Sequence, residues 1–197
     1  MSITKNMKEK IIISAIECFY RQGFLETTFQ QIAAKAKISQ PHIYNHFKNK
    51  MDLILECSKY ASEIGRQFID SSVDERKPAQ ERLNQYIEAN LRWFLKERAY
   101  GFCIISVYYF AQTHKEMRSA FAQLVESGIG RLEILLYQYQ NESRVPLSNI
   151  NTTAKIIHDI LIGEIYKIAL WDSKKNKQLN ETLNTDILAA IHKLLSP

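Results

Sequence analysis

Glycine, proline and cysteine are all scarce in this chain of 197 residues. There are six Gly and four Pro, and long intervals contain neither, which favours an all-α fold over a turn-rich β fold. The three cysteines, Cys18, Cys57 and Cys103, are odd in number and far apart, so they do not suggest a disulfide framework. We therefore expect reduced core thiols in a cytoplasmic protein.

Long apolar runs are missing as well. The longest, residues 102–111, is too short to span a bilayer, so no membrane partner is expected. The N-terminus leads into an amphipathic helix, and we expect no secretory signal. A hydrophobic content of 46% argues against intrinsic disorder.

Motifs for catalysis or cofactor binding are also absent from the sequence. It contains no nucleophile elbow, P-loop, dinucleotide fingerprint or metal-ligand cluster. An enzyme alternative rests on Cys103 with His114 or His158, and no feature of the spacing places these residues together. We expect no catalytic residue, no cofactor and no metal.

What the sequence does contain is a positive charge concentrated at one end. Residues 1–50 hold eight Lys and Arg against three Glu, which accounts for the whole excess of five, while the rest of the chain holds eighteen of each sign. Such an excess is typical of a phosphate-binding surface. Its basic start, residues 5–10, can lie along a nucleic-acid backbone or form a solvated tail.

Two short amphipathic segments follow in residues 27–50. Thr28 and Gln31 fit a capping box, which predicts a helix start. A second helix is predicted to begin at Ser39, whose hydroxyl can cap free backbone N–H groups, with Pro41 in its first turn. The pattern predicts a helix-turn-helix whose second helix enters the DNA major groove.

The outward side of the second helix is polar but not dominated by Lys and Glu. It carries Gln40, His42, Tyr44, Asn45 and His46. An ordinary helical hairpin also has an exposed polar side, so this pattern alone does not decide between a surface and a binding site. The local charge excess favours the binding site.

The run from Phe19 to Leu53 resembles the N-terminal domain of the TetR family of bacterial transcriptional regulators. The resemblance is carried by Arg21-Gln22-Gly23-Phe24, Thr27-Thr28, Ile32-Ala33, Ile38-Ser39, Ile43-Tyr44, His46-Phe47 and Lys50. Residues 40–46 are especially similar to the recognition helix of the family's tetracycline-responsive founder. Lys37 departs from the pattern, because many members have Gly there, and it would carry modest strain at positive φ.

The resemblance implies an all-α chain of about nine helices, with a DNA-binding domain in residues 1–50 and a ligand-binding and dimerisation domain in residues 51–197. It implies a homodimeric repressor that leaves a palindromic double-stranded operator when a small-molecule effector binds. We expect Gln40, His42 and Asn45 to reach base edges, and Pro41 a thymine methyl. The residues expected to contact the DNA backbone are Thr28, Tyr44, His46 and Lys50.

Hydrophobic periodicity predicts further helices, including the first at about residues 8–22 and the last two at about 152–171 and 181–195. The helix over 152–171 is apolar nearly all round, so it needs cover on both sides. In the TetR family the last two helices form a four-helix bundle between subunits. The residues predicted for this interface are Gly163, Tyr166, Leu170, Leu183, Ile187 and Ile191.

Glu164 lies in the inward stripe of that helix, where a carboxylate is costly unless it is paired. It forms either a structural ion pair or dimer contact, or the anchor of an aromatic pocket suited to a cationic or polar aromatic ligand. The other candidate pocket residues are Asn90, Tyr108, Tyr109 and Trp171. A ligand-independent DNA-organising protein of the same fold remains the alternative, and it would lack a shielded cavity in the second domain.

Overall fold

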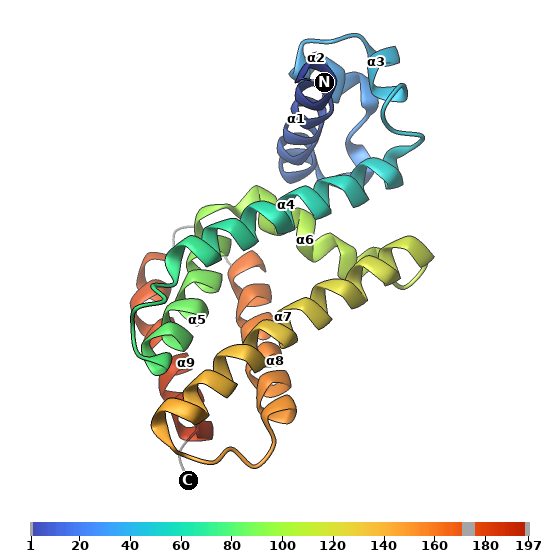
Figure 1. Cartoon of the computed structure of the whole chain (residues 1–197). Coiled ribbons are helices and arrows are strands. Elements are labelled where there is room, and N and C mark those ends of the chain that lie inside the picture. The colour runs from blue at the N-terminus through green and yellow to red at the C-terminus, as the bar shows by residue number, and fades with distance from the viewer. Residues whose placement is uncertain (1, 171–175, 196–197) are drawn as a thin grey trace. The chain divides into compact units, whose positions relative to one another are not determined.

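The computed structural model describes the backbone of residues 2–170 and 176–195, and the side chains of residues 7–169 and 185–195 (Figure 1). Within these ranges the chain forms nine helices and no strand, which confirms the predicted all-α class. No helix among them has both the length and the apolar character to cross a membrane. The helices are α1 (Ser2–Glu26), α2 (Phe29–Ala36), α3 (Gln40–Tyr44), α4 (Lys50–Ser72), α5 (Ala79–Lys96), α6 (Arg98–Phe110), α7 (Lys115–Ser143), α8 (Ile150–Leu170) and α9 (Asn176–Leu195).

The chain divides into two compact units. The first unit contains Met1–Ile64 and Glu97–Phe121, and the second contains Gly65–Lys96 and Ala122–Pro197. The whole of α6 therefore belongs with the helix-turn-helix segment. The functional boundary expected at residue 50 stays a prediction.

Helix α1 is longer than predicted at both ends. Gly23, the predicted stop, has φ 80° and ψ 164°, so the helix is kinked there and the chain continues for one short turn. Only glycine adopts such a positive φ without a steric penalty from Cβ. The sequence signal thus marked the break correctly, although the helical assignment continues to Glu26.

Helix α2 begins at the predicted capping box. The Thr28 hydroxyl accepts a hydrogen bond from the Gln31 N–H at 3.2 Å, and the Thr28 N–H donates to Gln31 Oε1 at 2.7 Å. Two N–H groups that a helix start would otherwise leave free are thereby bonded. The cap prediction is confirmed.

The end of α2 explains the unusual residue in the turn. Lys37 has φ 54° and ψ 49°, which is the left-handed region. Its N–H donates to Ala34 O at 3.1 Å, and the Ile38 N–H donates to Ala33 O at 3.0 Å. These paired bonds form a Schellman motif, which turns the chain sharply toward α3. The position therefore does require a positive φ, which is the condition under which modest strain is expected at Lys37.

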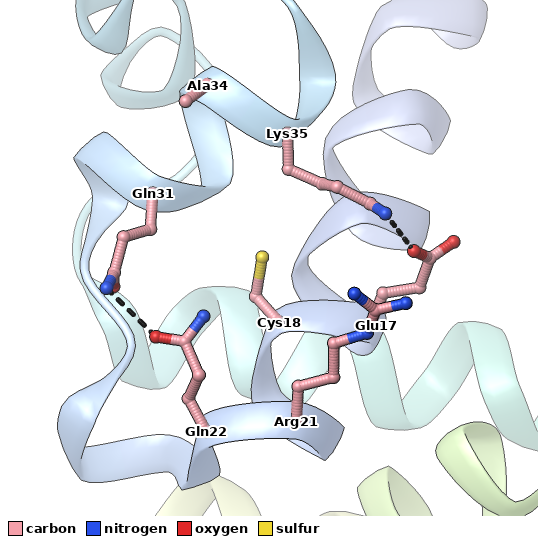
Figure 2. Close-up of a pocket in the computed structure, with 7 residues that line it drawn as sticks. All are labelled: Glu17, Cys18, Arg21, Gln22, Gln31, Ala34 and Lys35. Atoms are coloured by element: carbon pink, nitrogen blue, oxygen red, sulfur yellow. Dashed lines mark hydrogen bonds and ion pairs between the residues drawn. The ribbon is translucent and has the colours of Figure 1, made fainter.

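Two side-chain bridges join α2 to α1 (Figure 2). The Lys35 ammonium lies 2.5 Å from the Glu17 carboxylate, and Gln31 Nε2 donates to Gln22 Oε1 at 2.9 Å. Gln31 therefore takes part in both the helix cap and an interhelical bridge. These contacts hold α2 against α1 through residues that are not part of its buried side.

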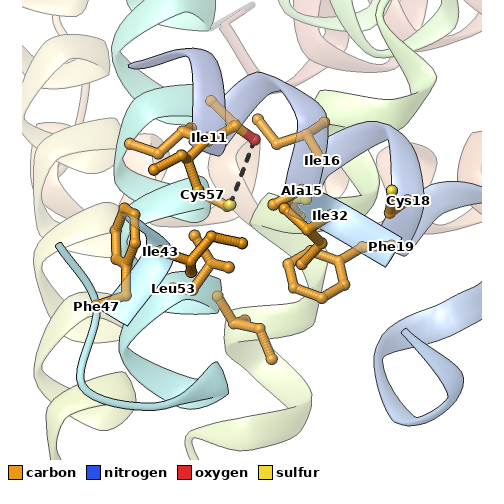
Figure 3. Packing of buried hydrophobic residues seen from close by; sticks show 14 of the residues in the cluster. Ile11, Ala15, Ile16, Cys18, Phe19, Ile32, Ile43, Phe47, Leu53 and Cys57 are labelled. Carbon is orange, nitrogen blue, oxygen red and sulfur yellow. Dashed lines mark hydrogen bonds between the residues drawn. The ribbon is translucent and has the colours of Figure 1, made fainter. Parts of the chain in front are cut away.

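The core of the first unit is built from α1, α2, α4 and α6 together with residues of and after α3 (Figure 3). The Cys57 thiol donates to Ile12 O at 3.7 Å, and the Ser58 hydroxyl lies 2.6 Å from Cys103 O, which links α4 to α6. Burial of this apolar surface supplies most of the driving force for packing the helices. Fully buried members include Ile11, Ile16, Phe19, Ile32, Ile43, Phe47, Leu53 and Ile54.

In the second unit, α5 packs against α8 and α9. The buried residues repeat at helical spacing, as predicted, and include Leu83, Ile87, Leu91, Ile157, Leu161, Ile168, Ile187 and Ile191. Arg82 is also buried, and its guanidinium lies 2.6 Å from Glu142 and 3.2 Å from Glu75. This ion pairing compensates for the removal of the guanidinium charge from water.

Candidate DNA-binding surface

Helix α3 is held by two apolar anchors. Ile43 is fully buried and Phe47, just after the helix, is 1% exposed. Pro41 occupies the first turn, where its missing N–H costs nothing. The helix is shorter than predicted, because Asn45 and His46 lie in the following turn instead of on the helix. That turn stays close to helical geometry, since the Asn45 N–H still donates to Pro41 O at 3.2 Å.

The predicted capping role of Ser39 is wrong. Ser39 does precede α3 with extended backbone angles, but its hydroxyl makes no capping bond. It lies instead 2.6 Å from Nδ1 of His42. This contact orients the imidazole and leaves Nε2 as the ring nitrogen that can meet another molecule.

The polar side of α3 faces solvent. Tyr44 is 55% exposed and packs edge-on against Phe29, with ring centroids 5.1 Å apart. Tyr44 is therefore accessible to solvent while the Phe29 ring supports its own ring. Gln40, Pro41, His42 and Asn45 are exposed, and His46 is half-buried.

Two residues predicted to contact the DNA backbone also have internal partners. The Thr28 hydroxyl belongs to the α2 cap. The Lys50 ammonium donates to Leu25 O at 3.0 Å and to Thr27 O at 3.1 Å. An ammonium has three donors, so one N–H of Lys50 remains for a phosphate while the other two tie the start of α4 to the α1–α2 connection. Sequence reasoning missed this second role.

The lysines at the start of α1 likewise differ in whether they have an internal partner. The Lys8 ammonium lies 2.6 Å from the Glu56 carboxylate. Burial is the largest single effect on the pKa of Glu56 and raises it, but the hydrogen bonds and charges of Lys8 and Lys59 together lower this pKa by more, so the net shift is downward. Lys10 is exposed, and the side chain of Lys5 lies outside the described residues. Lys37 is exposed in the turn between α2 and α3, and Lys48 is exposed after the end of α3. The surface around α3 thus retains positive charge.

The residues predicted to line a ligand pocket are distributed over both compact units. Asn90 and Glu164 belong to the second unit, and Tyr108 and Tyr109 to the first. Tyr109 is 74% exposed, so it does not line a shielded cavity, and Tyr108 packs edge-on against Phe121 with ring centroids 4.6 Å apart. Trp171 lies outside the described residues.

Asn90 and Glu164 each have a partner within their own helix. The Asn90 amide donates to Tyr86 O at 2.8 Å, so the backbone of its own helix supplies a partner for this polar group. The Glu164 carboxylate is 14% exposed and pairs through Oε1 with the Lys167 ammonium. Its other oxygen is buried and has no hydrogen-bond partner among the described residues.

The residues predicted for a dimer interface fall into three groups. Gly163 is exposed and Tyr166 half-buried on α8. Ile187 and Ile191 are 5% and 0% exposed within their own chain, so they are packed inward and offer no surface to a partner. The side chains of Leu170 and Leu183 lie outside the described residues.

The thiol considered for the enzyme alternative is buried. Cys103 has no exposed surface, and desolvation raises its pKa to about 12. Because the thiolate is the nucleophile, a thiol with this pKa is inert near neutral pH. His158 belongs to the other compact unit. Among the described residues, no group of three or more His, Cys, Asp or Glu could hold a metal ion.

Comparison with known proteins agrees with this arrangement. The profile of "Bacterial regulatory proteins, tetR family" matches residues 11–57, which run from α1 into α4. The HTH-type regulator YerO of Bacillus subtilis (strain 168), described as uncharacterized, is 37% identical over 76 residues, covering 39% of this chain and 24% of YerO. The chain spans about a quarter to a half of the length of the curated relatives it matches.

Solved structures extend the fold match over nearly the whole chain. The regulator FadR from Bacillus subtilis, solved in complex with stearoyl-CoA, has a TM-score of 0.73 at 17% identity and covers 93% of this chain and 96% of its own. AibR, solved with isovaleryl coenzyme A and operator DNA, has a TM-score of 0.72 at 17% identity over 93% and 97% of the two chains. The helix-turn-helix segment of this chain, residues 11–57, therefore matches the tetR family of bacterial regulatory proteins, and the chain as a whole shares the fold of FadR and AibR.

Proposed function

We propose that this protein is a homodimeric transcriptional repressor that binds a palindromic operator and leaves it when a small molecule binds its second unit. The observation that carries the proposal is the solvent-facing polar side of α3, mounted on a helix-turn-helix in the part of the chain that holds the net positive charge. A helix of this kind fits the major groove of B-DNA.

In this proposal the exposed residues divide the work of recognition. Gln40 and Asn45 carry amides that match adenine in the major groove, and His42 presents Nε2 as a donor or acceptor. Pro41 reaches a thymine methyl. Tyr44, His46, Thr28 and the remaining donor of Lys50 bind the sugar-phosphate backbone and set the register without reading sequence.

A homodimer would place two α3 helices one turn of DNA apart, about 34–36 Å. We assign the interface to α8, including exposed Gly163 and half-buried Tyr166, because the inward residues of α9 are already packed in their own chain. Apart from the neighbouring backbone of α8 itself, no atom of the described residues lies within 4 Å of the position that a Cβ of Gly163 would occupy, so a helix of another subunit can approach its backbone closely.

An effector site in the second unit is supported by buried polar atoms that lack hydrogen-bond partners among the described residues. They include Trp93 Nε1, Gln138 Oε1 and Glu164 Oε2. A buried polar group without a partner is costly, and such groups in a binding protein are natural ligand contacts. AibR and FadR, which share the fold, were solved with acyl-CoA molecules, so acyl-CoAs are the first class to test.

The proposal is tested by selecting bound sites from random DNA with the intact protein. We expect a palindromic motif, and we expect Gln40→Ala to relax the preference at one position of each half-site by about 1–3 kcal/mol. Gln80→Ala, at an exposed position of α5, is the matched control and should leave the motif unchanged. A motif without symmetry, or one that Gln40→Ala does not alter, would refute the assignment.

Release is tested on the selected site by fluorescence anisotropy. Isovaleryl-CoA, stearoyl-CoA and a cationic aromatic compound are added separately, with free coenzyme A as the control. Dissociation by one class, with a coupling of about 1–3 kcal/mol, supports the repressor mechanism. If DNA binding is retained and no effector can be found, the ligand-independent alternative is favoured.

A further inference from the structure

A second candidate binding site lies inside the first unit, between α1 and α2. A pocket of about 280 Å³ lies between these helices and is open to solvent on one side. Its lining residues are Glu17, Cys18, Arg21, Gln22, Gln31, Ala34 and Lys35 (Figure 2). The size is close to the lower limit of about 300 Å³ for small-molecule pockets, so the occupant must be smaller than a typical drug-sized ligand.

The two sides of the pocket are fixed by the interhelical bridges. The Lys35–Glu17 ion pair closes one side, and the hydrogen bond from Gln31 to Gln22 closes the other. In Figure 2 the Cys18 thiol points into the space between these bridges, and Ala34 lies on the α2 side. The cavity is therefore framed by bonded side chains, and its inner surface includes a thiol and a methyl group.

The charges around the pocket favour an anion. Glu17 and Lys35 neutralise each other, whereas Arg21 is exposed and makes no hydrogen bond or ion pair among the described residues. Burial raises the pKa of the Cys18 thiol and the Glu17 carboxylate adds to that rise, whereas the positive charges of Lys35 and Arg21, which also line the pocket, oppose it. A planar guanidinium binds a carboxylate through two parallel hydrogen bonds.

We propose that this pocket binds a small organic monocarboxylate, whose carboxylate pairs with Arg21 and whose apolar part lies against Cys18 and Ala34. Gln22 and Gln31 supply polar contacts on the side that their hydrogen bond closes. The site is separate from the effector site proposed in the second unit and does not depend on it. Because Gln31 also belongs to the Thr28 capping box, the ligand would contact the residue that starts the first helix of the helix-turn-helix.

Cys18 provides a built-in reporter of occupancy. It is 6% exposed, whereas Cys57 and Cys103 are fully buried. The intact protein is treated with N-ethylmaleimide with and without benzoate, and the modified cysteine is located by peptide mass spectrometry. We expect benzoate to slow modification of Cys18 in a saturable manner, and benzamide, its neutral analogue, to have at least about tenfold weaker effect, since it lacks the charged partner for Arg21.

Two variants test the role of the charge. Arg21→Gln should weaken protection by benzoate about tenfold or more. Lys193→Gln removes the same charge at an exposed position of α9 in the other unit, and it should leave protection unchanged. Equal protection by benzoate and benzamide, or full protection in Arg21→Gln, would overturn the proposal.

A second measurement does not depend on thiol reactivity. In a benzoate titration followed by ¹H–¹⁵N NMR, the side-chain amides of Gln22 and Gln31 and the backbone amide of Ala34 should shift together and saturate. The absence of these shifts would overturn the proposal even if Cys18 reacts too slowly to report. Inorganic phosphate is added as a third probe: shifts with phosphate but not with benzoate would assign Arg21 to a phosphate and refute the carboxylate site.

Discussion

Lys37 offers a quantitative test of how the turn before α3 is built. It is one of two non-glycine residues with positive φ among the described residues, and its angles of 54° and 49° lie in the left-handed region. For an L-residue this region costs about 1–2 kcal/mol. Lys37→Gly removes that cost but gives the unfolded chain about 0.5–1 kcal/mol of additional conformational entropy. The expected net gain is about 0.5–1 kcal/mol.

The assay is urea unfolding of the intact protein followed by circular dichroism, supported by thermal melting. For a chain of this length the gain corresponds to a rise in Tm of about 1–4 °C. Lys10→Gly is the matched control, because Lys10 is exposed within α1 of the same compact unit. The same replacement in a helix should cost about 0.8–1.0 kcal/mol.

The two variants should therefore shift stability in opposite directions. Both remove a positive charge from the first unit, so a charge effect alone would move them in the same direction. A Lys37→Gly protein that is less stable than the parent by as much as Lys10→Gly would refute the reasoning from the left-handed turn.

Three further outcomes are expected. Gly128→Ala should destabilise the second unit by about 1–3 kcal/mol, because its Cβ would lie 2.9 Å from the ring of buried His158. Gly130→Ala is the control, since its Cβ would meet no atom of the described residues within 4 Å outside the neighbouring backbone of α7, and it should stabilise the unit by up to about 1 kcal/mol in chemical denaturation. Burial lowers the pKa of His158 below 6.5, so in mild acid the unfolded state binds more protons than the folded state, and the free energy of unfolding should fall as pH drops below about 6.5. His158→Gln should remove this part of the pH dependence in thermal melts between mildly acidic and neutral pH. Gln31→Ala should cost about 1–2 kcal/mol, because it removes the side-chain half of the capping box and the bridge to α1, while the Thr28 hydroxyl keeps its bond to the backbone N–H of residue 31. Gln30→Ala, at its exposed neighbour, should cost less than about 0.5 kcal/mol, and equal losses by urea unfolding would contradict the role given to the Gln31 side chain.

The sequence by itself determined the features whose bonds are local. The Thr28–Gln31 capping box connects groups three residues apart, and the break at Gly23 depends on the backbone angles of that residue alone. Residue types fix such contacts, because only certain side chains reach the free N–H groups of a helix start and only certain residues tolerate positive φ. Helical periodicity likewise identified most of the buried stripes.

Only the tertiary structure decided where longer-range partners lie. The Lys50 ammonium bonds carbonyls 23 and 25 residues away, and the bridges from α2 to α1 enclose a pocket that no sequence motif marks. Burial also decided which candidate site residues are accessible. Tyr109, a predicted pocket residue, faces solvent, whereas Ile187 and Ile191, predicted for the dimer interface, are packed inside their own chain. Periodicity shows that a helix has an apolar side, but the packing of the other helices determines which surface covers it, and that depends on contacts distant in sequence.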